Sequence, residues 1–182
     1  MNQAREDFPR QTDAVVIGGG VIGISTALHL ARQGVSTILC EKGELGGEQS
    51  GRNWGWCRTI GRDLRELPLA LESLRWWREH SAETGFRQTG IAYLCDNARE
   101  VEQHADWLAR AGKVDGARII GADEAQSLFP GTQRRWPGGL FAPNDGCAEP
   151  TLAVAALAQA ARSEGVRLLT QCAVRGIETS AG

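Results

Sequence analysis

The hydrophobic pattern changes its period twice near the start of the chain. Ala14–Ile17 is a continuous apolar run, typical of a strand that is buried on both faces at the centre of a parallel sheet. Apolar residues then recur at helical spacing as far as about Arg32, and Gly34 stands where a left-handed helix cap belongs. A second apolar run follows at residues 35–40. This order predicts a strand, a helix and a second strand.

The later part of the chain mixes helical and strand periods. Pro68 suits the first turn of a helix that Gly85 would close. Helical spacing returns in three segments, residues 97–111, 122–129 and 151–163. Strand-like runs occupy three others, residues 88–95, 136–142 and 166–169. The last of these is predicted to be a third parallel strand, which a right-handed crossover would place beside the first strand.

A glycine motif lies between the first strand and the helix. Residues 18–23, GGGVIG, have the spacing G-x-G-x-x-G. Gly18 permits a tight turn, Gly20 leaves open space for the approach of a pyrophosphate, and Gly23 lets the helix lie close to the strand. The spacing in this context predicts a dinucleotide site, and a glycine-rich turn without a ligand is the alternative.

The helix start and the end of the second strand supply the chemistry of this site. The main-chain amides of Val21 and Ile22, with the positive end of the helix dipole, favour phosphate. Glu41 and Lys42 end the second strand about 20 residues beyond the glycines, where a carboxylate can accept hydrogen bonds from a ribose diol. The same carboxylate would repel a 2′-phosphate, which argues against NADP.

Residues 43–61 form a glycine-rich loop with neither a helical nor a strand period. The loop follows the strand that ends at Glu41, so it is expected at the carboxyl edge of the sheet, where ligands bind. Gly46-Gly47, Ser50, Asn53 and Gly55 stand at offsets that resemble the flavin-side loop of the D-amino-acid oxidase (DAO) family of FAD-dependent oxidoreductases. The segment GRNWGWCR, residues 51–58, is most similar to the corresponding segment of family members described as D-amino-acid dehydrogenases.

This resemblance implies FAD as the cofactor and assigns roles in binding it. Ser50 would reach the pyrophosphate, and the main chain from Asn53 to Trp56 would pass the isoalloxazine ring. The segment around Val174 resembles the one whose main chain pairs with the adenine edge; a plain strand end is the alternative. The expected cofactor-binding residues are Gly18, Gly20, Val21, Ile22, Gly23, Glu41, Lys42, Gly47, Ser50, Arg52, Asn53, Trp54, Gly55 and Val174.

Other residues of this loop have two interpretations. Trp54 and Trp56 could exclude water from the flavin or pack at the boundary between two domains. A basic run could hold phosphate or a substrate carboxylate, or could be solvated; its members are Arg52, Arg58, Arg62 and Arg65. Cys57 is expected to be a buried, inert thiol rather than a flavin attachment site.

The resemblance also implies a domain organisation. Residues 144–150, NDGCAEP, look like the family signature D-G-x-x-D-P, with Glu149 in place of the more usual Asp or Asn. We therefore predict an α/β fold, with a Rossmann-like FAD-binding parallel sheet formed by residues 1–84 and 144–182. Residues 85–143 would be an inserted α+β lobe that begins the substrate domain. Only three parallel strands are predicted, so the chain is expected to be a truncated, N-terminal part of such an enzyme.

The function implied for the complete protein is FAD-dependent oxidation of an amine. The favoured substrate is a D-amino acid, oxidised to an imine that water hydrolyses to a keto acid. No catalytic residue can be named from these residues. The alternatives are an NAD-linked dehydrogenase, which the loop at 43–61 disfavours, and a non-catalytic fragment that binds FAD or pairs with another subunit.

Composition narrows the remaining choices. The 182 residues are 42% hydrophobic and 23% charged, with a net charge of -2, which gives no reason to expect a nucleic-acid partner. Five dispersed cysteines without a C-x-x-C pair favour a reducing compartment. The polar start at residues 1–12 is expected to be a loose leader, not a signal peptide, and no run is long enough to span a membrane. We therefore predict a cytoplasmic protein that takes a small-molecule substrate and holds no metal.

Overall fold

The structure is a computed structural model that describes residues 9–179. The first part of the expected leader, residues 1–8, lies outside the described residues, as do residues 180–182. The chain forms two compact units, one of residues 1–53 with 150–182 and the other of residues 54–149. These boundaries differ from the predicted sections, which divide the chain after residues 84 and 143.

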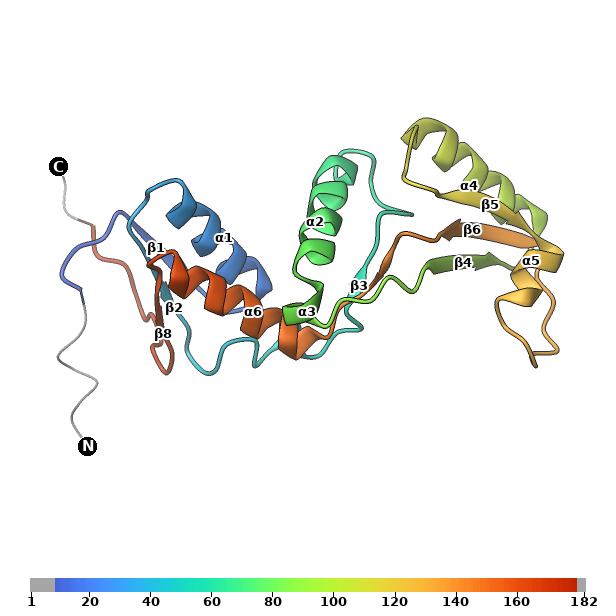
Figure 1. Ribbon diagram of the computed structural model, residues 1–182. Helices are drawn as coiled ribbons and strands as arrows, with labels where there is room; N and C mark the ends of the chain where they lie inside the picture. Colours follow the sequence, from blue (N-terminus) through green and yellow to red (C-terminus); the bar gives the residue numbers. More distant parts are fainter. Residues whose placement is uncertain (1–8, 180–182) are drawn as a thin grey trace. The chain divides into compact units, whose positions relative to one another are not determined.

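The first unit is a parallel sheet with two helices. Its strands are β1 (Ala14–Ile17), β2 (Thr37–Cys40) and β8 (Arg167–Leu169). Its helices are α1 (Val21–Arg32), the short 3-10 helix η1 (Gln49–Gly51) and α6 (Pro150–Ser163). The three strands are parallel in the order β1-β2-β8, and α1 packs beside α6 (Figure 1). The predicted α/β class is confirmed for this unit.

The strand order corrects two predictions. The third strand, β8, pairs with β2 and not with β1, so β2 is the central strand of this sheet. Among residues 9–179, β1 pairs only with β2, and the side chains of Val15 and Ile17 are 54% and 58% exposed. The expectation that β1 lies at the sheet centre, buried on both faces, is therefore wrong here. All four residues of β2 are buried instead, and an apolar run alone cannot tell which strand is central.

Small and branched residues hold α1 against the sheet and α6. Ile24, Ala27 and Leu28 are the buried residues of α1, and Gly34 follows the helix with the left-handed φ of 81° that the sequence predicts. On α6 the buried residues include Ala153, Leu157 and Ala161. Alanines on the facing stripes let the two helices approach closely.

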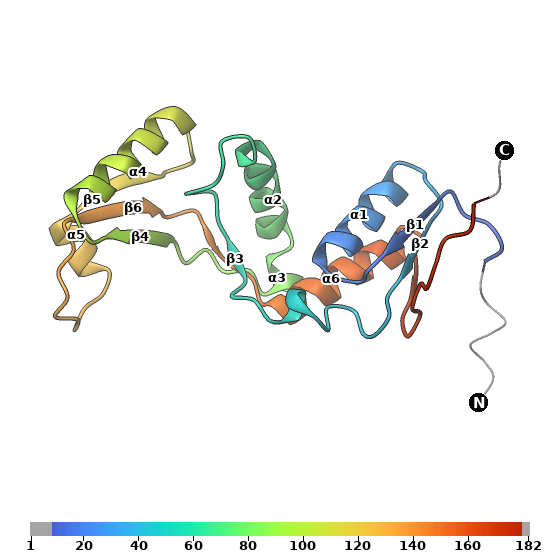
Figure 2. The ribbon, with the colours of Figure 1, turned by 180° about the vertical axis from the view of Figure 1, so that it is seen from behind.

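The second unit is built on an antiparallel sheet. Its elements are β3 (Trp56–Cys57), α2 (Leu67–Glu79), α3 (Ser81–Thr84), β4 (Ile91–Cys95), α4 (Ala98–Ala111), β5 (Arg118–Gly121), α5 (Ala122–Ser127), β6 (Gly138–Ala142) and β7 (Gly146–Cys147). The main sheet has the order β4-β6-β5, and α4 packs along it (Figure 2). Short strands β3 and β7 form a separate antiparallel pair.

One cluster of buried apolar side chains forms the core beneath this sheet. It contains Ile60, Ile91, Leu140 and Ala142, with Trp107 and other partly buried residues packed against it. Ile60 comes from the loop at residues 43–61, where no regular structure is predicted, although η1 and β3 also lie there. Among the described residues, no helix combines the length and apolar character that a membrane span requires.

Candidate nucleotide-binding site

The glycine turn between β1 and α1 is tight enough to require glycine. Gly18 has φ of 109°, a conformation that other residues rarely adopt, and its amide donates to the carbonyl of Cys40 at 2.8 Å. A Cβ on Gly23 would lie 1.9 Å from the carbonyl oxygen of Gly18. The helix therefore begins directly against the turn, as the motif predicts.

The space next to Gly20 differs from the prediction. A Cβ on Gly20 would lie 2.9 Å from the hydroxyl oxygen of Ser50, so a side chain already borders this position. The expectation of open space above Gly20 is wrong in that respect. The group that borders Gly20 is the short Ser50 side chain, which η1 carries. The loop after β2 brings η1 next to the start of α1. It is also the side chain for which the family resemblance implies a pyrophosphate contact.

Ser50 is joined to the start of α1 by a hydrogen bond. The amide of Val21 donates to the Ser50 hydroxyl at 2.9 Å. The first amides of a helix have no partner within the helix, and this hydroxyl satisfies one of them from a distant segment. The structure therefore brings Gly20, Val21 and Ser50 together. Because a hydroxyl can donate as well as accept, Ser50 can still offer its proton to an anion at the same place.

Glu41 connects the end of β2 to the glycine turn. Its side chain is buried, and its two carboxylate oxygens accept hydrogen bonds from the amides of Gly19 at 2.6 Å and Gly43 at 2.7 Å. These amides, that of Gly43 first, hold the pKa of Glu41 below its usual value. Glu41 is therefore a carboxylate at neutral pH. Each oxygen has a second lone pair, so the carboxylate keeps the capacity to accept from a ribose.

An exposed ion-pair group lies beyond Glu41, and its central residue, Glu48, was not among the predicted site residues. The Glu48 carboxylate contacts the Lys42 ammonium at 3.2 Å and the Arg52 guanidinium at 2.7 Å. The pKa of Glu48 is lowered by Lys42 first and then by Arg52. The spacing of four residues between Glu48 and Arg52 is a sequence signal that could have revealed this pair. Both predicted cationic residues of the site are thus held by one acid.

Asn53 and Gly47 shape the loop that carries Ser50. The Asn53 side-chain amide donates to the carbonyls of Ser50 at 2.8 Å and Gln49 at 3.3 Å. The amide of Gly47 donates to the carbonyl of Glu44 at 3.0 Å. A Cβ on Gly51 would lie 2.5 Å from the carbonyl of Gly46. These contacts fix η1 and with it the position of the Ser50 hydroxyl.

The segment that contains Val174 begins next to Glu41. The amide of Cys172 donates to the carbonyl of Glu41 at 2.8 Å, and the amide of Glu41 donates to the carbonyl of Leu169 at 2.8 Å. Val174 itself is 39% exposed. The backbone after β8 therefore leaves the sheet at the edge where Glu41 lies.

Two of the predicted cofactor-binding residues, Trp54 and Gly55, belong to the second unit. Trp54 is 77% exposed, and its ring centre lies 4.9 Å from that of Trp56. Gly55 has φ of 66° and accepts a hydrogen bond from the amide of Ala148 at 2.9 Å. Cys57 lies nearby in β3, and burial raises the pKa of its thiol to about 12. This thiol stays protonated at neutral pH, which agrees with an inert residue.

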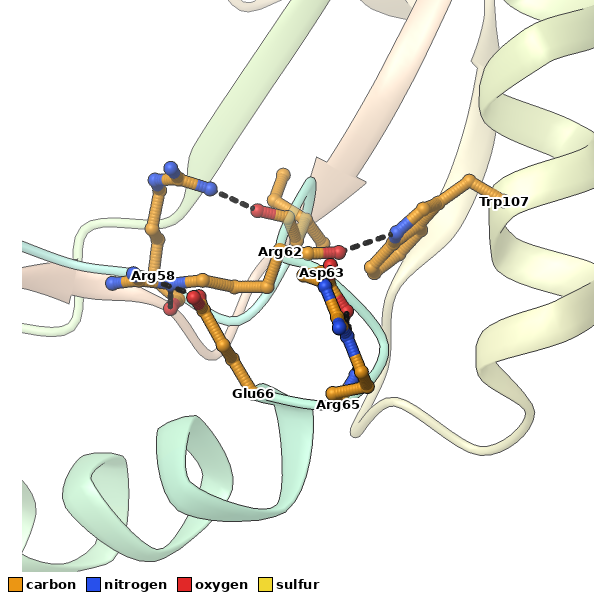
Figure 3. A network of polar contacts seen from close by, with 7 residues as sticks. Arg58, Arg62, Asp63, Arg65, Glu66 and Trp107 are labelled. Atoms are coloured by element: carbon orange, nitrogen blue, oxygen red, sulfur yellow. Dashed lines mark hydrogen bonds and ion pairs between the residues drawn. The ribbon is translucent and has the colours of Figure 1, made fainter.

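The rest of the basic run is occupied by contacts within the second unit (Figure 3). Arg58 donates to the carbonyl of Ile60 at 2.6 Å, and Arg62 donates to the carbonyl of Arg58 at 3.3 Å. Arg65 binds the Asp63 carboxylate at 2.7 Å. These guanidinium groups organise the turn before α2, and this use explains their spacing without a ligand.

A second buried carboxylate was missed as an organising residue. Asp145 is fully buried and accepts from the amide and hydroxyl of Thr59, both at 2.8 Å, and from the amide of Ile60 at 3.3 Å. The sequence analysis noted Asp145 only as part of the signature at residues 144–150. Its partners are 85 and 86 residues away, so no local pattern could reveal them.

The geometry of the first unit suits a dinucleotide. The helix-start amides and the Ser50 hydroxyl form a site of anion-binding character, and the close packing at Gly23 lets the helix begin directly at the turn. Glu41 adds a buried carboxylate at the end of the adjacent strand. This donor and acceptor set fits a pyrophosphate with an attached ribose.

Comparisons with known proteins agree with this geometry. The family model described as DAO, FAD dependent oxidoreductase, matches residues 13–182. Human mitochondrial sarcosine dehydrogenase is 29% identical over 93% of this chain and 19% of its own length. Glycine oxidase of Bacillus licheniformis is 27% identical over 95% of this chain and 49% of its own length.

Solved structures show the same likeness. L-amino acid deaminase from Proteus myxofaciens has a TM-score of 0.86 and 31% identity, covering 99% of this chain and 42% of that chain. L-proline dehydrogenase from P. horikoshii has a TM-score of 0.84 and 27% identity, covering 93% of this chain and 46% of that chain. The chain thus spans less than half of each of these solved chains. Since the family model covers nearly all of it, the chain belongs to the DAO family of FAD-dependent oxidoreductases.

Proposed function

We propose that the complete protein oxidises a small α-amino acid, with a primary or N-methylated amine, at the carbon that bears nitrogen. The observation that carries this proposal is the family match over residues 13–182, together with the hydroxyl of Ser50 at the start of α1. The relatives are named for sarcosine, dimethylglycine and glycine, and the solved structures for L-amino acids and L-proline. All of these compounds carry a carboxylate beside the amine-bearing carbon.

The residues of the first unit would hold the adenosine diphosphate part of FAD. The amides of Val21 and Ile22 and the Ser50 hydroxyl would bind the pyrophosphate, and Glu41 would accept from the ribose. Gly18, Gly20 and Gly23 would keep the turn free of bulky side chains. Bound FAD supplies a ring that accepts hydride from the substrate carbon. The imine product would then be hydrolysed to a keto acid.

The remaining predicted contacts are part of the same proposal. Lys42 and Arg52 would turn from Glu48 to the phosphates, which costs little because both ion pairs are exposed. Gly47 and Asn53 would support the loop, and Val174 would meet the adenine edge through its main chain. Trp54 and Gly55 would lie at the flavin. We propose the D-enantiomer of the amino acid as the substrate. The support for this choice is the resemblance of residues 51–58 to D-amino-acid dehydrogenases alone.

Purified protein tests the cofactor and the reaction separately. We expect flavin absorbance in the complete protein, and keto acid formation when D-alanine, L-alanine, sarcosine or glycine is offered with an artificial electron acceptor. Turnover of the L-enantiomer alone would reject the D-specificity and keep the reaction class. Substrate-dependent NADH formation without bound flavin would reject both and restore the NAD-linked alternative.

A second candidate is that this chain is a cofactor-binding part without turnover of its own. Its share of the relatives' length, from 19% to 49% in the proteins named above, favours this candidate. Titration of the 182-residue chain with FAD is then expected to show weak binding and no keto acid. Turnover by this chain alone would contradict it. We also propose that the protein is located in the cytoplasm. If this chain is a cofactor-binding part, we propose that a partner subunit completes the site.

A further inference from the structure

Two cysteines far apart in sequence lie together at the end of the parallel sheet. Cys40 is the last residue of β2, and Cys172 follows β8 after a short turn. Their thiols are close enough for that of Cys172 to act directly on the titration of Cys40. Both cysteines are free thiols in the structure. Neither has a role in the proposed cofactor site.

The backbone fixes this pairing more firmly than the thiol contact does. Cys40 is the register partner of Leu169 in the parallel ladder. Gln171 then takes a left-handed φ of 53°, which turns the chain back, and the amide of Cys172 donates to the carbonyl of Glu41 at 2.8 Å. Cys172 is thus bound to the residue directly after Cys40. This hydrogen bond holds the two cysteines on neighbouring segments of the chain, next to each other at the end of the sheet.

We propose that Cys40 and Cys172 are a dithiol site that a peroxide converts to a reversible disulfide, which staples the end of β2 to the segment after β8. This inference concerns the folded chain alone and does not depend on FAD or on turnover. It assigns a modification site next to Glu41, at the edge of the sheet where the nucleotide is proposed to bind.

The two thiols have different roles in this reaction. Cys172 is the more accessible one, so its thiol reacts first: peroxide transfers one oxygen to sulfur, forming a sulfenic acid and releasing water. The Cys40 sulfur then attacks the Cys172 sulfur; the S–O bond breaks, and the hydroxyl leaves as a second water with the proton from Cys40. Two thiols and one peroxide therefore give one disulfide and two waters.

Burial supports this order of events. Burial first, and then the Cys172 thiol beside it, raise the pKa of the Cys40 thiol to about 11. Cys40 is therefore a poor first nucleophile toward peroxide in bulk solvent. A sulfenic acid on the adjacent residue removes the need for solvent access. Cys40 can then resolve it by proximity.

A second pair of cysteines provides a control within the same chain. Cys57 and Cys147 lie on the paired strands β3 and β7, but Cys57 is opposite Gly146 while Cys147 is opposite Trp56. Directly opposite residues share a face of the ladder, so the two side chains point to opposite faces. Closeness on paired strands is therefore not sufficient, and oxidation is expected to select Cys40 and Cys172.

The test is oxidation of the folded 182-residue chain with a slight excess of hydrogen peroxide. We expect the intact mass to fall by two hydrogens, a peptide map that links Cys40 to Cys172, and full reversal by dithiothreitol. Cys172→Ser should abolish the cross-link. The double variant Cys57→Ser with Cys147→Ser should retain it. Cys40→Ala is a further variant, but Cys172→Ser suffices if that one fails to fold.

A stability measurement distinguishes a Cys40–Cys172 disulfide that fits the native fold from one that distorts it. The oxidised wild type should unfold with a thermal midpoint about 5 °C above that of the reduced protein, because the bond closes a long loop in the unfolded chain. Cys172→Ser should show no such rise. Oxidation of Cys172 to sulfinic acid without a cross-link, a bond between Cys57 and Cys147, or a lowered midpoint would each overturn the proposal.

Discussion

A buried carboxylate organises a loop in each of the two compact units, yet the two carboxylates differ in what they leave available. Glu41 binds the amides of Gly19 and Gly43, and Asp145 binds the amides of Thr59 and Ile60. Asp145 is fully buried and also takes the Thr59 hydroxyl, so it accepts three hydrogen bonds inside the protein and is closed to solvent. Glu41 accepts two main-chain hydrogen bonds and stands beside the glycine turn, close to the start of α1.

Burial of a carboxylate therefore does not by itself mark a ligand site. The surroundings decide: Glu41 lies at the carboxyl end of a parallel strand, next to the amides of a helix start. Asp145 lies between short antiparallel strands and holds a loop down onto a hydrophobic core that contains Ile60. We therefore expect that loss of Asp145 lowers the stability of the fold. Loss of Glu41 should lower both stability and FAD affinity.

The largest effect is expected from Asp145→Ala. It leaves two buried amides and a hydroxyl without an acceptor, which should lower the free energy of unfolding by about 3 kcal/mol. Urea unfolding of the variant and the wild type measures this difference. Asp145→Asn keeps one oxygen acceptor and should lose less. A loss below about 1 kcal/mol for the alanine variant would contradict the role given to Asp145.

Gly23→Ala should come next, because the added Cβ would lie 1.9 Å from the carbonyl of Gly18 and must push the helix away from the turn. We expect a loss of about 2 kcal/mol in stability, and FAD affinity at least about tenfold weaker. Gly176→Ala in the same unit is the control, since nothing lies within 4 Å of its Cβ position. Equal behaviour of the two variants in FAD titration would refute the close packing.

Glu41→Gln tests the carboxylate of the first unit. Because the folded pKa of Glu41 is depressed, the stability it contributes is present above the ordinary value of 4.5 and is lost as the pH falls through the lower folded pKa. The wild type should therefore be about 2 kcal/mol more stable than the variant at neutral pH and approach it on acidification. Unfolding measured from pH 7 down to pH 3 checks this. A difference independent of pH would point to packing instead of charge.

Ser50→Ala should have a smaller effect. It removes the acceptor for the Val21 amide at the helix start, which should lower stability by about 1 kcal/mol, as for a lost helix cap. FAD affinity should fall as well if Ser50 contacts the pyrophosphate. Ser50→Thr keeps the hydroxyl and serves as the matched control. Unchanged FAD affinity in the alanine variant would leave Ser50 with a structural role only.

The smallest effect on stability is expected from Glu48→Gln, since its two ion pairs are exposed. The free energy of unfolding should change little, because water and salt screen exposed ion pairs. The variant releases Lys42 and Arg52, so FAD binding should strengthen slightly, and more at low salt. Titrations at two ionic strengths measure this. Weaker FAD binding would show that Glu48 positions the two cations instead of competing for them.

The predicted fold matched the structure where information was local. The end of α1 at Arg32, the positive φ of Gly34 and the glycine turn all follow from residues within a few positions of one another. The position of β8 next to β2 did not follow, because Val166 to Leu169 reads the same beside either strand. The bond from Val21 to Ser50, which spans 29 residues, was equally beyond a local pattern.

The sequence by itself established the local chemistry of this protein: a glycine turn, a helix start whose first amides have no partner within the helix, and an acid at the end of the next strand. The tertiary structure decided which groups meet there. It brought Ser50 to the start of α1, joined Glu48 to Lys42 and Arg52, set Cys172 beside Cys40 and committed Asp145 to Thr59. The reason is that steric and conformational requirements act between chain neighbours, whereas burial and hydrogen-bond partners depend on segments that only folding brings together.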